Sequence, residues 1–338
     1  MYSAPMRTLL RCGLAAVCVG LAAQANAGVS ASANATATPP ASVREQLAAS
    51  CLAGSGLRIG GGEILLSFDS AAYPVGKAQI CAWTARAAFA VTTYFGRFPV
   101  SQVNIVIKPM EGDRVNGGTT WGNADDGKPL IVIRLGRQVS AAQLEDDWTM
   151  THEMVHLSVP AVPENSHWLE EGIATYVEPI ARVQAGELSP QRIWADMLHG
   201  MRKGLPADGD RGLDNTPSWG RTYWGGALFC LMADVRIRQR TGNRKGLQDA
   251  LRGVLAGGGS IRVDSSVEAM LGLGDKAVGV PVLSELHREM GDAPMPAADD
   301  LQSLWQRLGV YPDGDSVRFD EAAPLAAVRR AITARSTG

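Results

Sequence analysis

The sequence predicts an α+β fold with a small, mostly antiparallel sheet in residues 42–139 and a helical part in residues 140–338. Apolar, β-branched runs are concentrated before residue 136, whereas after Ser140 the apolar residues recur with the helical period. The chain is 46% hydrophobic and 20% charged, which is typical of a soluble globular protein. No long polar linker separates the two parts, so we expect residues 42–338 to form one domain.

The N-terminal segment has the features of a secretory signal. Two arginines precede an apolar stretch, Cys12–Ala23, and an Ala-Asn-Ala sequence ends at Ala27. The apolar stretch is too short to span a bilayer. We therefore expect residues 1–27 to be a signal peptide, and the protein to be exported to the periplasm or secreted, with no transmembrane segment after signal cleavage. Residues 28–41, rich in Ala, Ser, Thr and Pro, are expected to be a flexible linker, either a tether or a processed pro-segment.

In the sheet-bearing part, helical and strand patterns alternate. The expected elements are, in order, a helix at Val43–Leu52, a strand at Glu63–Phe68, a helix at Lys77–Tyr94, and strands at Val103–Ile107 and Leu130–Leu135. Between the last two strands, residues 117–122 read GGTTWG. This segment is either a plain turn or a glycine-rich edge strand that can pair with an extended peptide.

In the helical part, helix start and stop signals are frequent. Ser140 is a plausible N-cap, and the helical period continues through Leu144–Leu157. A helical segment at residues 166–178 is expected to be interrupted by Pro179. Ser-Pro before a helix and Gly after it mark one further helix, from Pro190 to Gly204. The remaining expected helices are Tyr223–Arg240, Lys245–Leu255, Leu283–Met290, Asp300–Leu308 and Pro324–Thr333.

The net charge of −2 gives no electrostatic argument for a nucleic-acid partner, and none is expected. Of the five cysteines, two lie in the expected signal peptide. Because disulfides persist in an oxidising compartment, we expect Cys51 to pair with Cys81. Cys230 lies in an apolar helical run and is expected to be a buried, unreactive thiol.

The most informative motif is at residues 152–156, which read HEMVH. In a helix, positions i and i+4 lie on one face, so the imidazoles of His152 and His156 can reach a single metal ion. Glu153 can then place a carboxylate beside a metal-activated water. A catalytic zinc site usually has three protein ligands and an open fourth position. A third ligand is therefore needed.

Residues 166–178 read SHWLEEGIATYVE, and their pattern after HEMVH resembles the gluzincin metallopeptidases, above all the alanyl/leucyl and glycyl aminopeptidases. The resemblance implies a zincin-like, thermolysin-like domain with one Zn²⁺ per chain, held by His152, His156 and Glu171. Spacing alone does not choose between Glu170 and Glu171. Residues 222–228, TYWGGAL, resemble a helix start in the same families, which implies that Tyr223 stabilises the oxyanion.

The resemblance implies a zinc metallopeptidase acting on peptide or protein substrates, with Glu153 as general base. Those aminopeptidases grip the substrate's amino terminus with a Glu on a glycine-rich strand, and residues 117–122 contain no acid. An aminopeptidase would need another anchor, such as Glu170 or Glu178, so the choice between endopeptidase and aminopeptidase stays open. A second hypothesis is a catalytically silent zincin-fold protein with a binding or scaffolding role in the cell envelope.

Other polar side chains near the motifs have more ordinary interpretations. Thr175 and Glu178 are candidates for contacts behind the metal ligands. The remaining histidines, His167, His199 and His287, are expected to be structural, and Tyr176 to be a packing aromatic.

Overall fold

A computed structural model describes residues 41–54 and 56–335 of the chain. The expected signal peptide and residues 28–40 of the expected linker lie outside the described residues. Ala41 is the first residue of helix α1 (Ala41–Leu52), close to the predicted start of the folded part. Among the described residues, no helix has the length and apolar character needed to cross a membrane.

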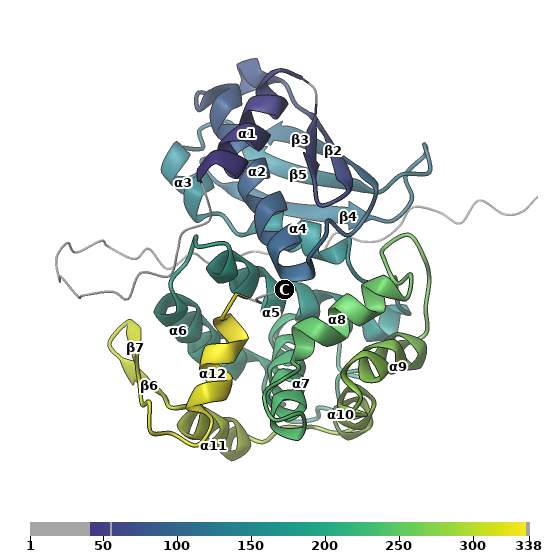
Figure 1. Cartoon of the computed structure of the whole chain (residues 1–338), viewed down its shortest axis with the longest axis vertical. Coiled ribbons are helices and arrows are strands. Elements are labelled where there is room, and N and C mark those ends of the chain that lie inside the picture. The colour runs from purple at the N-terminus through teal and green to yellow at the C-terminus, as the bar shows by residue number, and fades with distance from the viewer. Residues whose placement is uncertain (1–40, 55, 336–338) are drawn as a thin grey trace, which may run out of the picture. The chain divides into compact units, whose positions relative to one another are not determined.

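The sheet-bearing part contains a five-stranded sheet with the order β1-β2-β3-β5-β4, drawn in the upper half of Figure 1. Its strands are β1 (Leu57–Ile59), β2 (Gly62–Ser67), β3 (Gln102–Met110), β4 (Val115–Trp121) and β5 (Leu130–Gly136). The sheet is mixed, because β2, β3 and β5 run parallel while β1 and β4 pair antiparallel at the two edges. The prediction of a mostly antiparallel sheet was therefore wrong.

The helix between β2 and β3 explains the parallel pairing of these two strands. Helix α2 (Gly76–Phe95) carries the chain back along the sheet, and a crossover of this kind is what parallel neighbours require. The sequence analysis predicted both strands and this helix but did not infer from them that the two strands run parallel. Residues 117–122 belong to β4 and its end, so they form an edge strand and not a plain turn.

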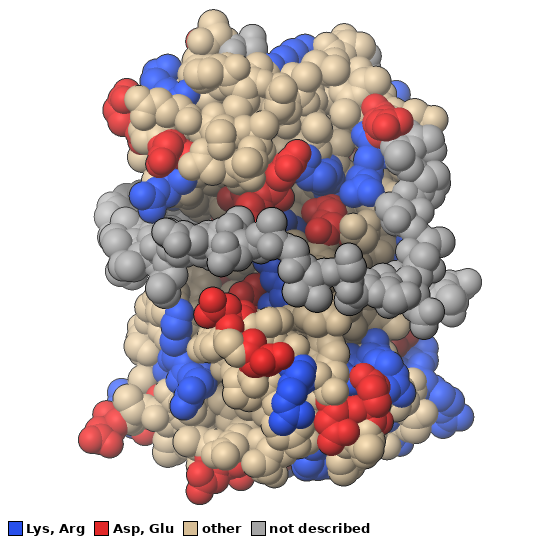
Figure 2. Space-filling view, turned by 90° about the vertical axis from the view of Figure 1, so that its left-hand side faces the viewer, with Lys and Arg blue, Asp and Glu red and all other residues tan. Residues whose placement is uncertain are grey.

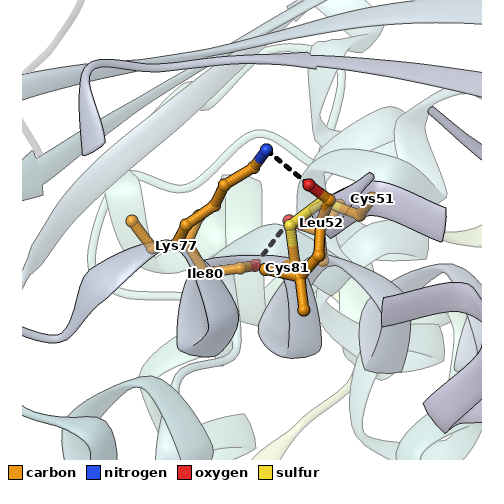
Figure 3. Close-up of a disulfide and its surroundings, with 6 residues drawn as sticks. Cys51, Leu52, Lys77, Ile80 and Cys81 are labelled. Atoms are coloured by element: carbon orange, nitrogen blue, oxygen red, sulfur yellow. Dashed lines mark hydrogen bonds between the residues drawn. A yellow bond between two sulfur atoms is a disulfide. The ribbon is translucent and has the colours of Figure 1, made fainter. Parts of the chain in front are cut away.

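A disulfide joins the first two helices, as predicted. Cys51 of α1 and Cys81 of α2 have Cα atoms 5.7 Å apart, and their S–S bond is drawn in Figure 3. Lys77 Nζ donates to Leu52 O at 2.7 Å beside it, which ties the end of α1 to the same face of α2. The remaining described cysteine, Cys230, is buried, and burial raises the pKa of its thiol.

The predicted helix Leu144–Leu157 is two helices, α3 (Ala141–Asp146) and α4 (Thr149–His156). The break lies at Asp147, whose backbone is extended with ψ 135°. Its side chain then accepts from Thr149 Oγ1 at 3.0 Å and from Met150 N at 3.4 Å. Asp147 thereby satisfies donors at the start of α4, which is why the helix restarts there.

In the helical part, two predictions about α5 and α6 had different outcomes. Helix α5 (His167–Gln184) follows the 3₁₀ turn η2 (Glu164–Ser166) and continues through Pro179, so the predicted interruption was wrong. The missing N–H of Pro179 removes one hydrogen bond without ending the helix. Residues of α5 both before and after Pro179 are buried in the core. Helix α6 (Pro190–Gly200) begins after the Ser189 N-cap and ends in the 3₁₀ turn η3 (Met201–Gly204), as the Ser-Pro and Gly signals predicted.

The other elements of the helical part lie below the sheet in Figure 1. They are the π-helical turn η4 (Gly220–Gly225), α7 (Gly226–Arg240), α8 (Leu247–Ala256), α9 (Val267–Val278), α10 (Val282–Met290), α11 (Ala298–Leu308), the hairpin β6 (Val310–Asp313) and β7 (Ser316–Phe319), and α12 (Ala326–Thr333). Helix α9, the hairpin and β1 were not predicted. In Figure 2, acidic and basic side chains are interspersed over the visible parts of both halves.

Helices α5 and α7 approach each other closely at two glycines. A Cβ on Gly172 would lie 2.3 Å from the backbone carbon of Gly226, and a Cβ on Gly226 would lie 2.3 Å from Trp168 O. These neighbours are backbone atoms that cannot move aside, so both positions require glycine. The contact brings η4, with Tyr223, against the segment of α5 that carries Glu171.

Candidate metal and catalytic site

Three side chains converge where α4 meets the first turns of α5. Ligand atoms of His152, His156 and Glu171 all lie within 4.8 Å of one another. Glu171 Oε2 is 3.1 Å from His152 Nε2 and 3.6 Å from His156 Nε2. The two histidines point from the same face of α4, as their spacing predicted, and all three residues are buried.

The electrostatics of this cluster favour a cation. Burial is the largest effect on His156 and opposes its protonation, but the neighbouring Glu171, Glu153 and Glu170 together raise its pKa to about 9. Burial likewise opposes ionisation of Glu171, yet contacts with the surrounding histidines hold its pKa well below the ordinary value. Three buried or nearly buried carboxylates thus surround the imidazoles, and their negative charge must be balanced by protons or by a metal ion.

The side chain of Glu153, a residue of α4, lies against β4, the edge strand of the sheet. Thr120 Oγ1 of β4 is 2.6 Å from Glu153 Oε2 and 3.0 Å from Glu153 O, so the hydroxyl can donate to either acceptor. Glu153 is 6% exposed, and Gly118 of the same strand leaves the space that its side chain fills. The sequence analysis did not find Thr120 or Gly118, because strand β4 comes beside α4 only in the folded chain.

Tyr223 lies in the π-helical turn η4, and its ring is 6.4 Å from the ring of His152 with an interplanar angle of 24°. The structure therefore places this predicted residue beside the cluster of His152, His156 and Glu171. Two exposed tryptophans border the same residues. The ring of Trp148 makes an edge contact with the ring of His152, with centroids 5.1 Å apart, and the ring centroid of Trp219 lies 5.9 Å from that of Tyr223. π-helical turns are rare and frequently occur at functional sites.

His167, the first residue of α5, contacts the cluster. Its Nδ1 is 3.0 Å from Glu170 Oε2 and its Nε2 is 3.2 Å from Glu171 Oε1. These hydrogen bonds, first to Glu170 and then to Glu171, raise the pKa of His167 to about 10. A signal was present in the sequence, because His167 and Glu171 have the same i,i+4 spacing as His152 and His156.

The two acids considered as anchors for a substrate amine have other partners. Glu170 Oε1 accepts from Val162 N at 2.8 Å while its Oε2 faces His167. Glu178 is buried and pairs with Arg182 at 3.0 Å rather than contacting the cluster. Thr175 is half-buried one turn beyond Glu171.

The remaining predicted structural residues behave as expected. Tyr176 is fully buried and donates to Asp234 Oδ2 at 3.1 Å, which is a packing role. His199 Nδ1 is 2.9 Å from Ala195 O within α6, and His287 Nε2 is 2.8 Å from Asp214 Oδ2.

The donor set fits a zinc ion. Two imidazole nitrogens and one carboxylate oxygen converge from two helices, and this His₂Glu combination is a known catalytic zinc ligand set. Imidazole binds a metal only when neutral, so a bound cation would replace the proton that otherwise balances the carboxylates. Pockets of about 350 and 410 Å³ lie elsewhere, beside Leu66 of β2 and Arg252 of α8, and the cluster residues line neither.

Comparison with known proteins shows similarity at the level of the fold. No family model matches the sequence, and no curated protein matches it. An aminopeptidase N family protein from Idiomarina loihiensis has a similar structure, with a TM-score of 0.55 and 14% identity over 74% of this chain and 47% of its own. An M1 zinc metallopeptidase from Deinococcus radiodurans is 18% identical over 64% of this chain and 45% of its own, with a TM-score of 0.42. The chain spans about half the length of these structures.

Proposed function

We propose that the protein is a zinc-dependent peptidase whose metal is held by His152, His156 and Glu171. The observation that carries this proposal is the convergence of the three donors directly beside Glu153, a buried acid that is not one of them. A protein that bound zinc only for stability would not need an acid and a phenol at the same place. The similarity in fold to an aminopeptidase N family protein supports the proposal.

The chain's own residues have distinct roles in the proposed hydrolysis of a peptide bond. A zinc ion in the site would act as a Lewis acid toward water and the scissile carbonyl. Glu153 accepts the proton of the attacking water on its carboxylate and later delivers it to the leaving amine. Thr120 holds Oε2 of that carboxylate, so its orientation is fixed before substrate arrives. The Tyr223 hydroxyl donates to the oxyanion that develops on the carbonyl.

Strand β4 is suited to hold the substrate backbone. Among the described residues, β4 pairs with β5 alone, and at the edge of the sheet its other side can take up an extended chain. An extended peptide added at an edge strand gains main-chain hydrogen bonds that do not depend on sequence. We therefore propose peptides or unfolded protein segments as the substrates.

Cleavage is proposed not to require a free amino terminus. Glu170 and Glu178, which could have anchored an amine, are engaged by Val162, His167 and Arg182. Peptides with free and with acetylated amino termini, compared at equal concentration, test this point. Equal kcat/KM for the two sets is expected, whereas cleavage of the free peptides alone would show an aminopeptidase.

The peptidase proposal is tested with Glu153→Gln, which has nearly the same shape but no proton-accepting carboxylate. The variant is expected to keep one zinc per chain and lose cleavage of a peptide library. Glu164→Gln, an exposed position just before α5, is the matched control and should behave as wild type. If wild type holds zinc yet cleaves no member of the library, the peptidase proposal is wrong and the binding or scaffolding hypothesis replaces it.

Export is also proposed. The signal-like sequence of residues 1–27 and the disulfide between Cys51 and Cys81 support it, because structural disulfides are typical of oxidising compartments. Fractionation of cells producing the full chain, with mass analysis of the recovered amino terminus, tests the location and the cleavage site together.

A further inference from the structure

We infer that His167, held by Glu170, is a positioning residue that fixes which oxygen of Glu171 is presented to the metal. The inference rests on the proposed role of Glu171 as a metal ligand. It assigns a function to the side chains of His167 and Glu170, to which the sequence motif assigns none.

A continuous series of polar contacts leads from the backbone to the metal cluster. Val162 N donates to Glu170 Oε1 at 2.8 Å, and Glu170 Oε2 accepts from His167 Nδ1 at 3.0 Å. His167 Nε2 in turn contacts Glu171 Oε1 at 3.2 Å. Each carboxylate oxygen of Glu170 therefore has a partner, and the imidazole is fixed at both nitrogens.

The two oxygens of Glu171 face different partners. Oε1 faces His167, whereas Oε2 faces His152 and His156. A carboxylate whose first oxygen is engaged cannot rotate to offer both oxygens to one ion without breaking that contact. Ligation through a single oxygen leaves room for the open position that a catalytic zinc requires.

Packing does not explain His167. Its side chain is 42% exposed, so it fills no core space, while Glu170 and Glu171 beside it are buried. The backbone at the start of this series of contacts is also held in place, because Ala161, next to Val162, forms a β-bridge with Asp264 in the loop before α9. A side chain that is exposed itself but holds a buried ligand from behind is suited to orienting that ligand.

The test compares the full chain with His167→Ala, His167→Gln and His199→Ala. Metal affinity is measured by competition with a chelator, the coordination of cobalt substituted for zinc by its visible absorption spectrum, and cleavage by separate kcat and KM values. His167→Ala is expected to bind zinc about 10- to 100-fold more weakly. It should also show an altered cobalt spectrum and a lower kcat, with KM within about twofold of wild type.

The two other variants separate positioning from general damage. His167→Gln can still donate to a carboxylate and should restore part of the metal affinity. His199→Ala removes an exposed histidine of α6 and should match wild type in all three measurements. Thermal unfolding of each apoprotein shows whether the chain remains folded.

The possible outcomes distinguish this inference from the peptidase proposal. An unchanged zinc affinity and cobalt spectrum in folded His167→Ala overturns the inference, even if wild type is a peptidase. Weakened zinc binding and an altered spectrum in a protein that cleaves nothing supports the inference and contradicts the peptidase proposal. A wild-type chain that binds no zinc overturns both.

Discussion

Gly118 of β4 lies against the side chain of Glu153 of α4, so that a Cβ at position 118 would be 2.4 Å from Glu153 Cγ and 2.7 Å from Oε1. With the Thr120 hydroxyl two residues further along the strand, this contact fixes the proposed general base between sheet and helix. The glycine at position 118 therefore has a local structural reason. It provides space beside an edge strand for the carboxylate that is proposed as general base.

Gly118→Ala is expected to reduce kcat while leaving the fold and the zinc content intact. Because the clash is with a side chain, Glu153 must move away, and a shift of about 1 Å in a catalytic group lowers the rate by about 100-fold. The measurement is kcat of the zinc-loaded variant, with circular dichroism and zinc content as checks.

Gly272→Ala in α9 is the matched control, because its added Cβ meets no atom within 4 Å and its backbone is helical. It should leave kcat unchanged and stabilise the protein by about 0.5–1 kcal/mol. Equal activity in Gly118→Ala and the control would contradict the proposed placement of Glu153.

Tyr223→Phe is expected to lower kcat by about 100- to 1,000-fold, since the variant loses one donor to the developing oxyanion. KM and zinc content should change little, because the ring that stacks beside His152 is retained. Steady-state kinetics with elemental analysis of the same preparation check this.

Tyr176→Phe serves as a comparison for the loss of a phenol. It removes a buried hydrogen bond to Asp234, so it should lower the free energy of unfolding by about 1 kcal/mol without lowering kcat. A Tyr223→Phe enzyme with wild-type kcat would show that another group stabilises the oxyanion.

The disulfide between Cys51 and Cys81 is expected to stabilise the chain by about 3–4 kcal/mol, because it closes a loop over a sequence separation of 30 residues in the unfolded state. The double substitution of both cysteines by Ala should lower the free energy of unfolding by this amount and remove its sensitivity to reductant. Urea unfolding with and without reductant measures both effects.

Cys230→Ala separates the disulfide from the buried free thiol. Its stability should still fall on reduction by the same amount as that of wild type. If reductant destabilises the double variant as much as wild type, the disulfide does not stabilise the chain in the way described.

The raised pKa of the Glu178 carboxyl predicts that the free energy of unfolding falls as pH rises. Burial outweighs the attraction of Arg182 and raises its pKa from 4.5 to about 7. The native state therefore binds this proton more tightly than the unfolded state does. The resulting stabilisation is fully present below pH 4.5 and is lost as pH rises through 7, which amounts to about 3 kcal/mol.

Glu178→Gln should lose less stability than wild type between pH 5 and pH 8, as measured by urea unfolding at both pH values. Arg182 keeps Glu187 as a partner at 3.4 Å in this variant. Glu164→Gln, with an exposed carboxyl, should retain the full wild-type difference. Identical pH dependence in wild type and Glu178→Gln would contradict the raised pKa.

Local patterns in the sequence predicted the parts of the site that depend on one helix. The spacing of His152 and His156 needs only the helical period, and α4 places both rings as expected. The choice of Glu171 over Glu170 came from the family resemblance. In the structure, Glu171 is the carboxylate grouped with His152 and His156, while Glu170 bonds to Val162 N and His167.

Features that depend on contacts between distant segments could not be predicted in the same way. The parallel direction of β2 and β3 follows from how α2 carries the chain across the sheet. The break between α3 and α4 follows from hydrogen bonds of the Asp147 side chain, and an Asp in the sequence is equally compatible with the surface of an unbroken helix. The contact of Thr120 with Glu153 joins residues 33 positions apart. Composition and periodicity contain no information about such a pair.

The most direct test of the central claim is zinc stoichiometry by elemental analysis of wild type, Glu171→Ala and Glu164→Ala after equal exposure to zinc and removal of the excess. The account predicts one zinc per chain in wild type and in the exposed-site control Glu164→Ala, and little or none in Glu171→Ala. A folded wild-type protein without zinc, or a Glu171→Ala variant that retains a full equivalent, would contradict it.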